Sequence, residues 1–174
     1  MRNRSAKGGF TIVELMVTLA VAGILMGFAL PAFNDFVRQR SLSSSVNDFV
    51  LAVTYARSEA ARRGRTVSVQ AMDASDDTNE WGPGYCVVEG TPGDCNDPLR
   101  SFEATDTATI NAVNAGFHGT STLSFNARGM LTPRPAAAGA IEICSTDEDI
   151  TRGRVVSIEV IGRAVADDLE CHGA

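Results

Sequence analysis

An apolar run of 24 residues near the N-terminus, Phe10–Phe33, constrains this chain more than any other feature. The hydrocarbon core of a bilayer is about 30 Å thick, and a helix of about 20 apolar residues can cross it. The run therefore predicts one membrane-spanning helix rather than a helix of a soluble core. It contains a single charged side chain, Glu14, and it follows a short basic leader that carries Arg2, Arg4 and Lys7.

The leader predicts both processing and orientation. A secretory signal peptide has its small-residue cleavage site after the apolar segment. Here the small residues Gly8 and Gly9 come before that segment, so cleavage after Gly9 would leave the apolar helix on the mature protein. Because positively charged flanks stay on the cytoplasmic side, we expect the remainder of the chain to be exported.

Glu14 needs a charged partner if it lies in lipid, where an ionised carboxylate costs a few kcal/mol or more. No cation occurs within Phe10–Phe33. After cleavage at Gly9, a new α-amine would lie four residues from Glu14, about 6 Å along a helix. That amine could belong to the same subunit or to one shifted by a helical turn. The alternative is an interfacial glutamate whose side chain reaches water.

A second helical pattern follows the apolar run and predicts that the helix continues. The pair Arg62–Arg63 suits the negative end of a helix dipole, and Gly64 suits the C-terminal cap. We therefore expect the helix to end at Arg63, with a kink or brief break after Pro31. Apolar residues at spacings of three and four form one stripe: Leu42, Val46, Phe49, Val53, Ala56 and Ala60.

The helical period disappears from Arg65 onward, where short segments with alternating or β-branched apolar residues predict strands. Gly, Pro, Asn and Asp separate these segments. One long helix followed by many strands implies an α+β fold in which the helix packs on a sheet. The predicted strands are Thr66–Gln70, Tyr85–Glu89, Thr109–Val113, Leu123–Phe125, Ile141–Cys144 and Val155–Ile161.

All four cysteines lie in the part expected to be exported, where thiols are oxidised. Four cysteines allow three pairings. Cys86 and Cys95 flank a short Gly/Pro loop, so we predict that they pair and that Cys144 then pairs with Cys171. A zinc site is the alternative reading. It is disfavoured because no Cys-x-x-Cys spacing occurs and the chain has only two histidines, so no metal site is predicted.

The composition argues against catalysis and against general affinity for nucleic acid. The formal net charge is −6, which keeps an exported domain soluble by repulsion. Binding of nucleic acid depends on neutralising phosphates, for which an acidic domain is poorly suited. No Gly-x-Ser-x-Gly elbow, phosphate loop or metal-ligand cluster is present in the sequence. We therefore predict that the protein is not an enzyme and needs no cofactor.

The N-terminal residues closely resemble those of type IV pilins and type II secretion pseudopilins. The resemblance rests on the basic leader, the Gly9/Phe10 junction, Glu14 and Pro31. In that family a prepilin peptidase cuts after the glycine, the new N-terminal residue is N-methylated, and the glutamate meets the amine of a neighbouring subunit. The resemblance implies cleavage between Gly9 and Phe10, methylation of Phe10, and assembly contacts with other pilins or pseudopilins at Glu14 and Pro31.

Later segments narrow the resemblance to the GspH/FimT branch of that superfamily. This branch implies a pilin-like fold, with two antiparallel sheets packed around the helix, and a role as a minor subunit. It also implies a single-pass protein of the bacterial inner membrane with its globular domain in the periplasm, or a place in a pilus or pseudopilus. The segments are Tyr55–Gly64, Trp81–Tyr85, Phe125–Gly129, Ile141–Cys144 and Gly162–Arg163.

These inferences divide the chain into four segments. They are a prepilin leader over 1–9, a transmembrane helix half over 10–33, an amphipathic helix half over 34–64 and a β-rich domain over 65–174. We expect a minor pilin-like subunit that assembles into, or primes the assembly of, a type IV pilus or a type II secretion pseudopilus.

DNA uptake is the alternative function. DNA-binding members of the branch carry a C-terminal Gly-Arg-x-Arg loop, and the matching place here reads Gly162-Arg163-Ala164-Val165. The second arginine is missing, and acidic residues follow. Arg152 and Arg154 are the other candidate DNA contacts near this loop. We expect DNA binding to be weak or absent, because phosphate binding requires several clustered cations.

Overall fold

The computed structural model describes residues 10–75, 78–90, 95–113, 120–135, 137–146 and 152–171. The chain divides into two compact units, Met1–Gln39 and Arg40–Ala174. Helix α1 runs without interruption over Ile12–Arg63. The brief break expected after Pro31 therefore does not occur, because a proline removes only one donor from the helical ladder and α1 tolerates that loss.

Local chemistry sets both ends of α1. At the first turn, the backbone N–H of Glu14 donates to the Thr11 hydroxyl oxygen at 3.2 Å, so Thr11 caps the helix. At the other end, the N–H of Gly64 donates to the Ala60 carbonyl at 3.0 Å. Gly64 has a φ of 67°, a left-handed conformation that glycine adopts without a steric penalty. The helix therefore ends where the sequence predicted.

The first unit holds the N-terminal part of α1, whose apolar side chains are uncovered. The large apolar side chains described between Phe10 and Met26 are at least 50% exposed, and that of Phe10 is 82% exposed. No helix in the described ranges reaches both the length and the hydropathy expected of a transmembrane segment. The membrane span over 10–33 stays a prediction.

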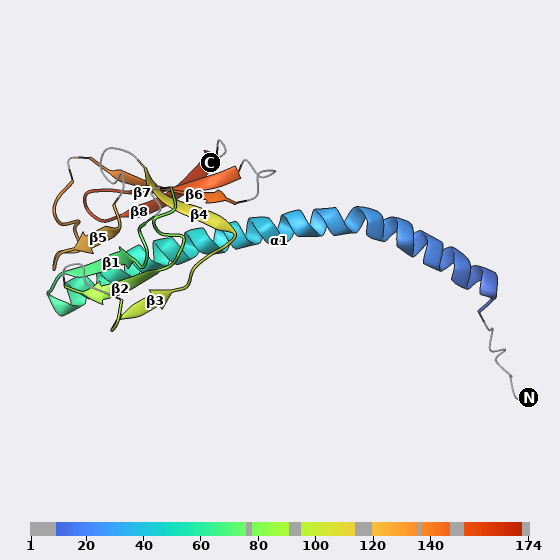
Figure 1. Ribbon diagram of the computed structural model, residues 1–174, viewed down its shortest axis with the longest axis horizontal. Helices are drawn as coiled ribbons and strands as arrows, with labels where there is room; N and C mark the ends of the chain where they lie inside the picture. Colours follow the sequence, from blue (N-terminus) through green and yellow to red (C-terminus); the bar gives the residue numbers. More distant parts are fainter. Residues whose placement is uncertain are drawn as a thin grey trace, which may run out of the picture. The chain divides into compact units, whose positions relative to one another are not determined.

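In the second unit, two four-stranded antiparallel sheets pack with the C-terminal part of α1 (Figure 1). The first sheet has the order β3-β2-β1-β5, and the second has the order β4-β6-β7-β8. Strands of the first sheet are β1 (Val67–Ala71), β2 (Tyr85–Glu89), β3 (Arg100–Phe102) and β5 (Thr122–Phe125). Those of the second are β4 (Ala108–Val113), β6 (Gly139–Ser145), β7 (Arg152–Ile158) and β8 (Ala164–Glu170).

One hydrophobic core takes side chains from α1 and from both sheets. All six residues of the predicted apolar stripe are buried in it. The Phe49 ring lies edge-on to the rings of Trp81 and Tyr85, with ring centroids 5.4 Å apart in both pairs. Burying an aromatic side chain of this size contributes about 1.5–3 kcal/mol, so this stripe holds α1 against the sheets.

Six of the strands correspond to predicted ones, and the remaining two were not predicted. β3 has three residues, too few for an alternating pattern to show. β8 carries exposed acidic residues instead of alternating apolar ones. The predicted strand Val155–Ile161 is wrong at both ends, because β7 ends at Ile158 and a turn follows. In that turn the N–H of Gly162 donates to the Glu159 carbonyl at 2.7 Å.

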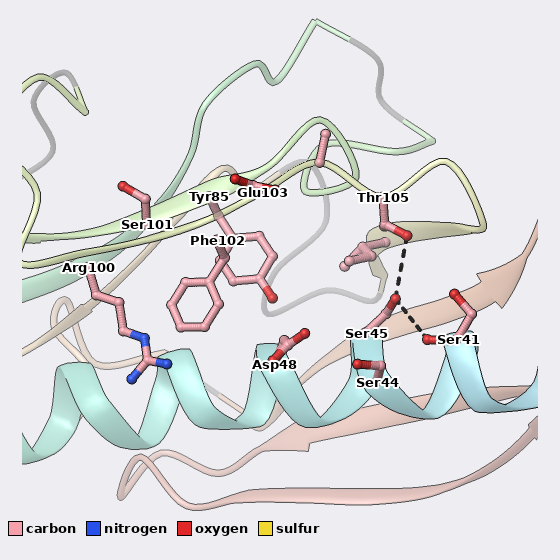
Figure 2. Close-up of a pocket in the computed structure, with 12 residues that line it drawn as sticks. Ser41, Ser44, Ser45, Asp48, Tyr85, Arg100, Ser101, Phe102, Glu103 and Thr105 are labelled. Atoms are coloured by element: carbon pink, nitrogen blue, oxygen red, sulfur yellow. Dashed lines mark hydrogen bonds between the residues drawn. The ribbon is translucent and has the colours of Figure 1, made fainter.

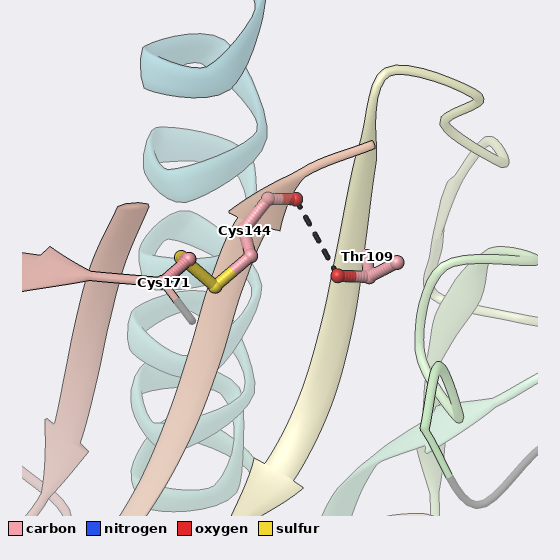
Figure 3. The surroundings of a disulfide bond; sticks show 3 residues. All are labelled: Thr109, Cys144 and Cys171. Atoms are coloured by element: carbon pink, nitrogen blue, oxygen red, sulfur yellow. Dashed lines mark hydrogen bonds between the residues drawn. A yellow bond between two sulfur atoms is a disulfide. The ribbon is translucent and has the colours of Figure 1, made fainter. Parts of the chain in front are cut away.

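Both predicted disulfides, Cys86–Cys95 and Cys144–Cys171, are present. The second joins the end of β6 to the residue after β8 (Figure 3), and β7 lies between these strands in the sheet. Gly153 of β7 pairs with Cys144 in the ladder. A Cβ atom at Gly153 would collide with the sulfur of Cys171, so this glycine makes room for the disulfide.

Replacing Gly153 with alanine should prevent the Cys144–Cys171 bond or distort the strands around it. Closing a loop with a sequence separation of 27 residues stabilises a fold by about 3–4 kcal/mol on the chain-entropy model. We expect Gly153→Ala to lose stability of that order in denaturant unfolding and to expose thiols to labelling. Ser157→Ala, on the same face of β7, is the matched control. Two intact disulfides with unchanged stability in Gly153→Ala would contradict this account.

Candidate assembly and recognition sites

The residues predicted to act in processing and assembly belong to the first unit. Gly9 lies outside the described residues. Phe10 is exposed, and Glu14 lies in the first turn of α1, where a carboxylate also complements the positive end of the helix dipole. Pro31 lies within α1, but its side chain is outside the described part. The described portion of this site is thus an exposed apolar helix with a carboxylate near its start.

A chain of ion pairs joins the end of α1 to β2. Glu59 accepts from Arg62 Nε at 3.0 Å and from a terminal Arg62 nitrogen at 2.6 Å, and it also accepts from Arg63 Nε at 2.6 Å. A terminal nitrogen of Arg63 donates to one carboxylate oxygen of Glu89 at 2.7 Å, and Arg65 donates to the other oxygen of Glu89 at 3.0 Å. Hydrogen bonds from the two arginines of α1 lower the pKa of Glu59 from 4.5 to about 2. This network holds the helix end against the first sheet.

The arginines proposed as DNA contacts do not form one cluster. Arg154 forms an ion pair with Asp168 of β8 at 2.8 Å, and Arg152 pairs in register with Glu170. Arg163 lies beyond the turn at the other end of β7. Six residue steps along a strand separate the two ends, about 20 Å. Acidic residues of β8 therefore offset the charge of the first two arginines, and the third lies apart.

The turn that carries Arg163 instead packs against a second turn, which carries Arg128. A Cβ atom on Gly162 would lie 2.5 Å from the Gly129 carbonyl oxygen, and one on Gly129 would lie 3.0 Å from the Arg57 side chain. The turns that carry Arg128 and Arg163 therefore meet above α1 at Arg57. Within the described ranges these three arginines have no acidic partner. The segments around Gly129 and Gly162 were noted in the sequence, but no spacing indicated that they meet.

A groove of about 390 Å³ lies between α1 and the segment formed by β3 and the loop after it (Figure 2). Tyr85 is 3% exposed, and its hydroxyl points from the sheet toward α1 and Asp48. Burial and the nearby Asp48 carboxylate raise the pKa of Tyr85 well above its usual value. The lining residues are Ser41, Ser44, Ser45, Asp48, Tyr85, Arg100, Ser101, Phe102, Glu103, Ala104, Thr105 and Ile110.

Hydroxyl groups hold one end of this groove together. The Ser45 hydroxyl bonds to the Ser41 carbonyl at 3.3 Å and to the Thr105 hydroxyl at 3.5 Å. The Ser41 and Thr107 hydroxyls lie 2.6 Å apart. Sequence reasoning missed this groove. The serines and Asp48 lie off the apolar stripe, but nothing in the sequence relates them to residues 100–105.

Two family models match this chain. One, described as "Type II transport protein GspH", matches residues 45–162, which is more than half of the chain. The other, described as "Prokaryotic N-terminal methylation motif", matches residues 4–30.

Among curated proteins, the type IV major fimbrial protein FimA of Dichelobacter nodosus is 43% identical over 44 residues, or 25% of this chain. The chain therefore spans only 28% of the length of that relative.

Solved structures are similar over the greater part of the chain. The type IV minor pilin FimU of Pseudomonas aeruginosa is 27% identical with a TM-score of 0.62, covering 79% of this chain and 99% of that one. The minor pseudopilin EpsH from the type 2 secretion system of Vibrio cholerae is 10% identical with a TM-score of 0.50. That match covers 75% of this chain and 97% of EpsH, and it is a likeness of fold alone.

The helix-end network predicts a pH dependence of stability. Because the pKa of Glu59 falls from 4.5 to about 2 on folding, its contribution is fully present above about pH 4.5 and is lost as the pH falls through about 2. Unfolding curves of the wild type and Glu59→Gln should differ most near neutral pH and converge toward pH 2. Glu142→Gln, on the outer face of β6, is the control. A difference that does not change with pH would contradict this assignment.

Proposed function

We propose that this chain, which belongs to the family described as Type II transport protein GspH, is a minor pilin-like subunit that assembles into a filament or primes its assembly. The observation that carries the proposal is the contrast along α1. The apolar side chains of its C-terminal part are buried in a core that it shares with two sheets, whereas the apolar side chains near its start are exposed. An exposed apolar surface of this extent calls for lipid or for other helices as partners.

The family implies association with other pilins, and the N-terminal methylation motif indicates a protein that is membrane-anchored or pilus-associated. In more detail, we infer a single-pass protein of the bacterial inner membrane with the second unit in the periplasm. A prepilin peptidase would cleave after Gly9, and methylation would follow on Phe10. Glu14 would then pair with the amine of a neighbouring subunit, and the segment around Pro31 would contact adjacent helices.

The family and fold are those of pilin and pseudopilin subunits, so we infer a structural role rather than catalysis. Of the two machines, we propose the type IV pilus. Sequence identity to the type IV minor pilin FimU is 27%, against 10% to the pseudopilin EpsH, whose likeness is one of fold. A type II secretion pseudopilus is the alternative machine. The two machines can be distinguished by identifying the co-assembling subunits that purify with the protein from its native cells.

DNA binding stays the second candidate function, and one observation favours it. The turn with Arg128 and the turn with Arg163 are in contact near Arg57 of α1, and no described acidic residue forms an ion pair with these three arginines. Against it, Arg154 is paired with Asp168, and the chain is acidic overall. Three phosphate contacts would give weak, strongly salt-dependent binding.

Glu14→Ala should separate processing from assembly. We expect the variant to be cleaved, with Phe10 as its methylated N-terminus by mass spectrometry, but to be strongly depleted from sheared filaments or tip complexes. The amine of a neighbouring subunit would have no charge partner in lipid. Glu142→Ala is the matched control and should incorporate normally. Normal incorporation of Glu14→Ala, or an intact Met1 in the wild type, would count against the proposal.

Duplex DNA should bind the protein weakly or not at all near physiological salt. A gel-shift titration of the detergent-solubilised full chain at several salt concentrations measures this. Micromolar or tighter binding that is lost in Arg163→Ala would make DNA uptake the preferred function. Arg152→Ala is the matched control, because Arg152 lies at the other end of β7.

A further inference from the structure

Opposite charges lie at opposite ends of the second unit. The first of these, the arginine end, consists of Arg57 on α1, Arg128 in the turn after β5 and Arg163 in the turn after β7. Arg128 and Arg163 are exposed, and no described acidic residue forms an ion pair with any of the three arginines. The two turns contain one acid, Glu159. The arginine end therefore has a net positive charge.

The acidic end lies where β4 and β7 begin and where β6 and β8 end. It consists of Glu103 and Asp106, between β3 and β4, and Glu170, the last residue of β8. All three are exposed, and none forms an ion pair with a described residue. Arg154 is paired with Asp168, and Arg152, beside Glu170 in register, offsets one charge. The acidic end therefore keeps a net negative charge.

The two ends are too far apart to neutralise each other within one chain. The hydroxyl of Thr107, the residue after Asp106, lies 2.6 Å from the Ser41 hydroxyl of α1, whereas the turn at Gly129 contacts Arg57 of the same helix. The sixteen residue steps from Ser41 to Arg57 span about 24 Å at the rise of a helix. The screening length at physiological ionic strength is about 8 Å. Each end is thus left to a partner outside the chain.

We infer that the arginine end of one copy of this chain docks on the acidic end of a second copy, an inference that rests on the proposed function. Guanidinium groups bind carboxylates through paired, charge-assisted hydrogen bonds. A contact between two different surfaces is heterologous, and it repeats in one direction when its rotation does not close a ring. That is the geometry of a filament. Duplex DNA would suit the arginine end alone, whereas a second copy complements both ends.

Sedimentation velocity of the full chain in density-matched detergent tests the contact with two charge-reversed variants. Arg128→Glu with Arg163→Glu makes both ends acidic, and Asp106→Arg with Glu170→Arg makes both ends basic. The wild type should form larger species at low salt that dissociate at high salt. For each variant alone we expect the dissociation constant to rise roughly tenfold or more, because like charges then face each other. An equimolar mixture of the two variants should associate again, because opposite ends meet.

A pair of single changes controls for net charge. Asp106→Arg should weaken the association, whereas Glu142→Arg changes the net charge equally on the outer face of β6 and should not. Wild-type association that persists at high salt would indicate contact through the apolar helix and would overturn the inference. So would a mixture that sediments like its separate components, or a wild type that stays monomeric at low salt. Glu14→Ala leaves both ends unchanged, so failure here is distinguishable from failure of the proposed function.

Discussion

The contacts of Phe49 with Trp81 and Tyr85 bring helix α1 and both sheets to one point of the core. Tyr85 begins β2 of the first sheet. Trp81, just before it, donates its backbone N–H to Ile110 of β4 in the second sheet at 3.1 Å, and its indole N–H bonds to the Thr120 carbonyl at 3.0 Å. Replacing this ring with a smaller side chain would leave a cavity between the helix and both sheets, which the surrounding structure could fill only in part.

The groove is a consequence of the same arrangement. Tyr85 stacks on Phe102 of β3 with ring centroids 4.9 Å apart, which sets β3 at a fixed place beside the helix. The tyrosine ring is long enough to fill the core, but its hydroxyl reaches the edge of the core, where α1 presents serines and Asp48. The packing of an apolar cluster thus places a polar group at the rim of the groove.

Much of the fold could be predicted because its signals are local. The apolar stripe of α1, the Gly64 cap and most of the strands are read from neighbouring residues, and the short loop between Cys86 and Cys95 indicated the disulfide pairing. β8 was missed because Asp167 and Asp168 replace the apolar alternation of a half-buried strand. An edge strand that faces solvent can be held by its ladder and a disulfide without such a pattern. The groove and the meeting of Arg57 with the turns at Gly129 and Gly162 depend on contacts between distant segments, which sequence spacing does not encode.

The disulfide at the end of β8 also decides how the second unit would respond to mechanical load. An antiparallel ladder pulled from its end opens one residue pair at a time. Here, tension applied beyond Cys171 would pass through the sulfur atoms into Cys144 of β6, an inner strand with β4 and β7 on either side. The edge pair β7–β8 would carry none of it. While this bond is oxidised, the domain cannot be unravelled from its C-terminal strand, and reduction would remove that protection.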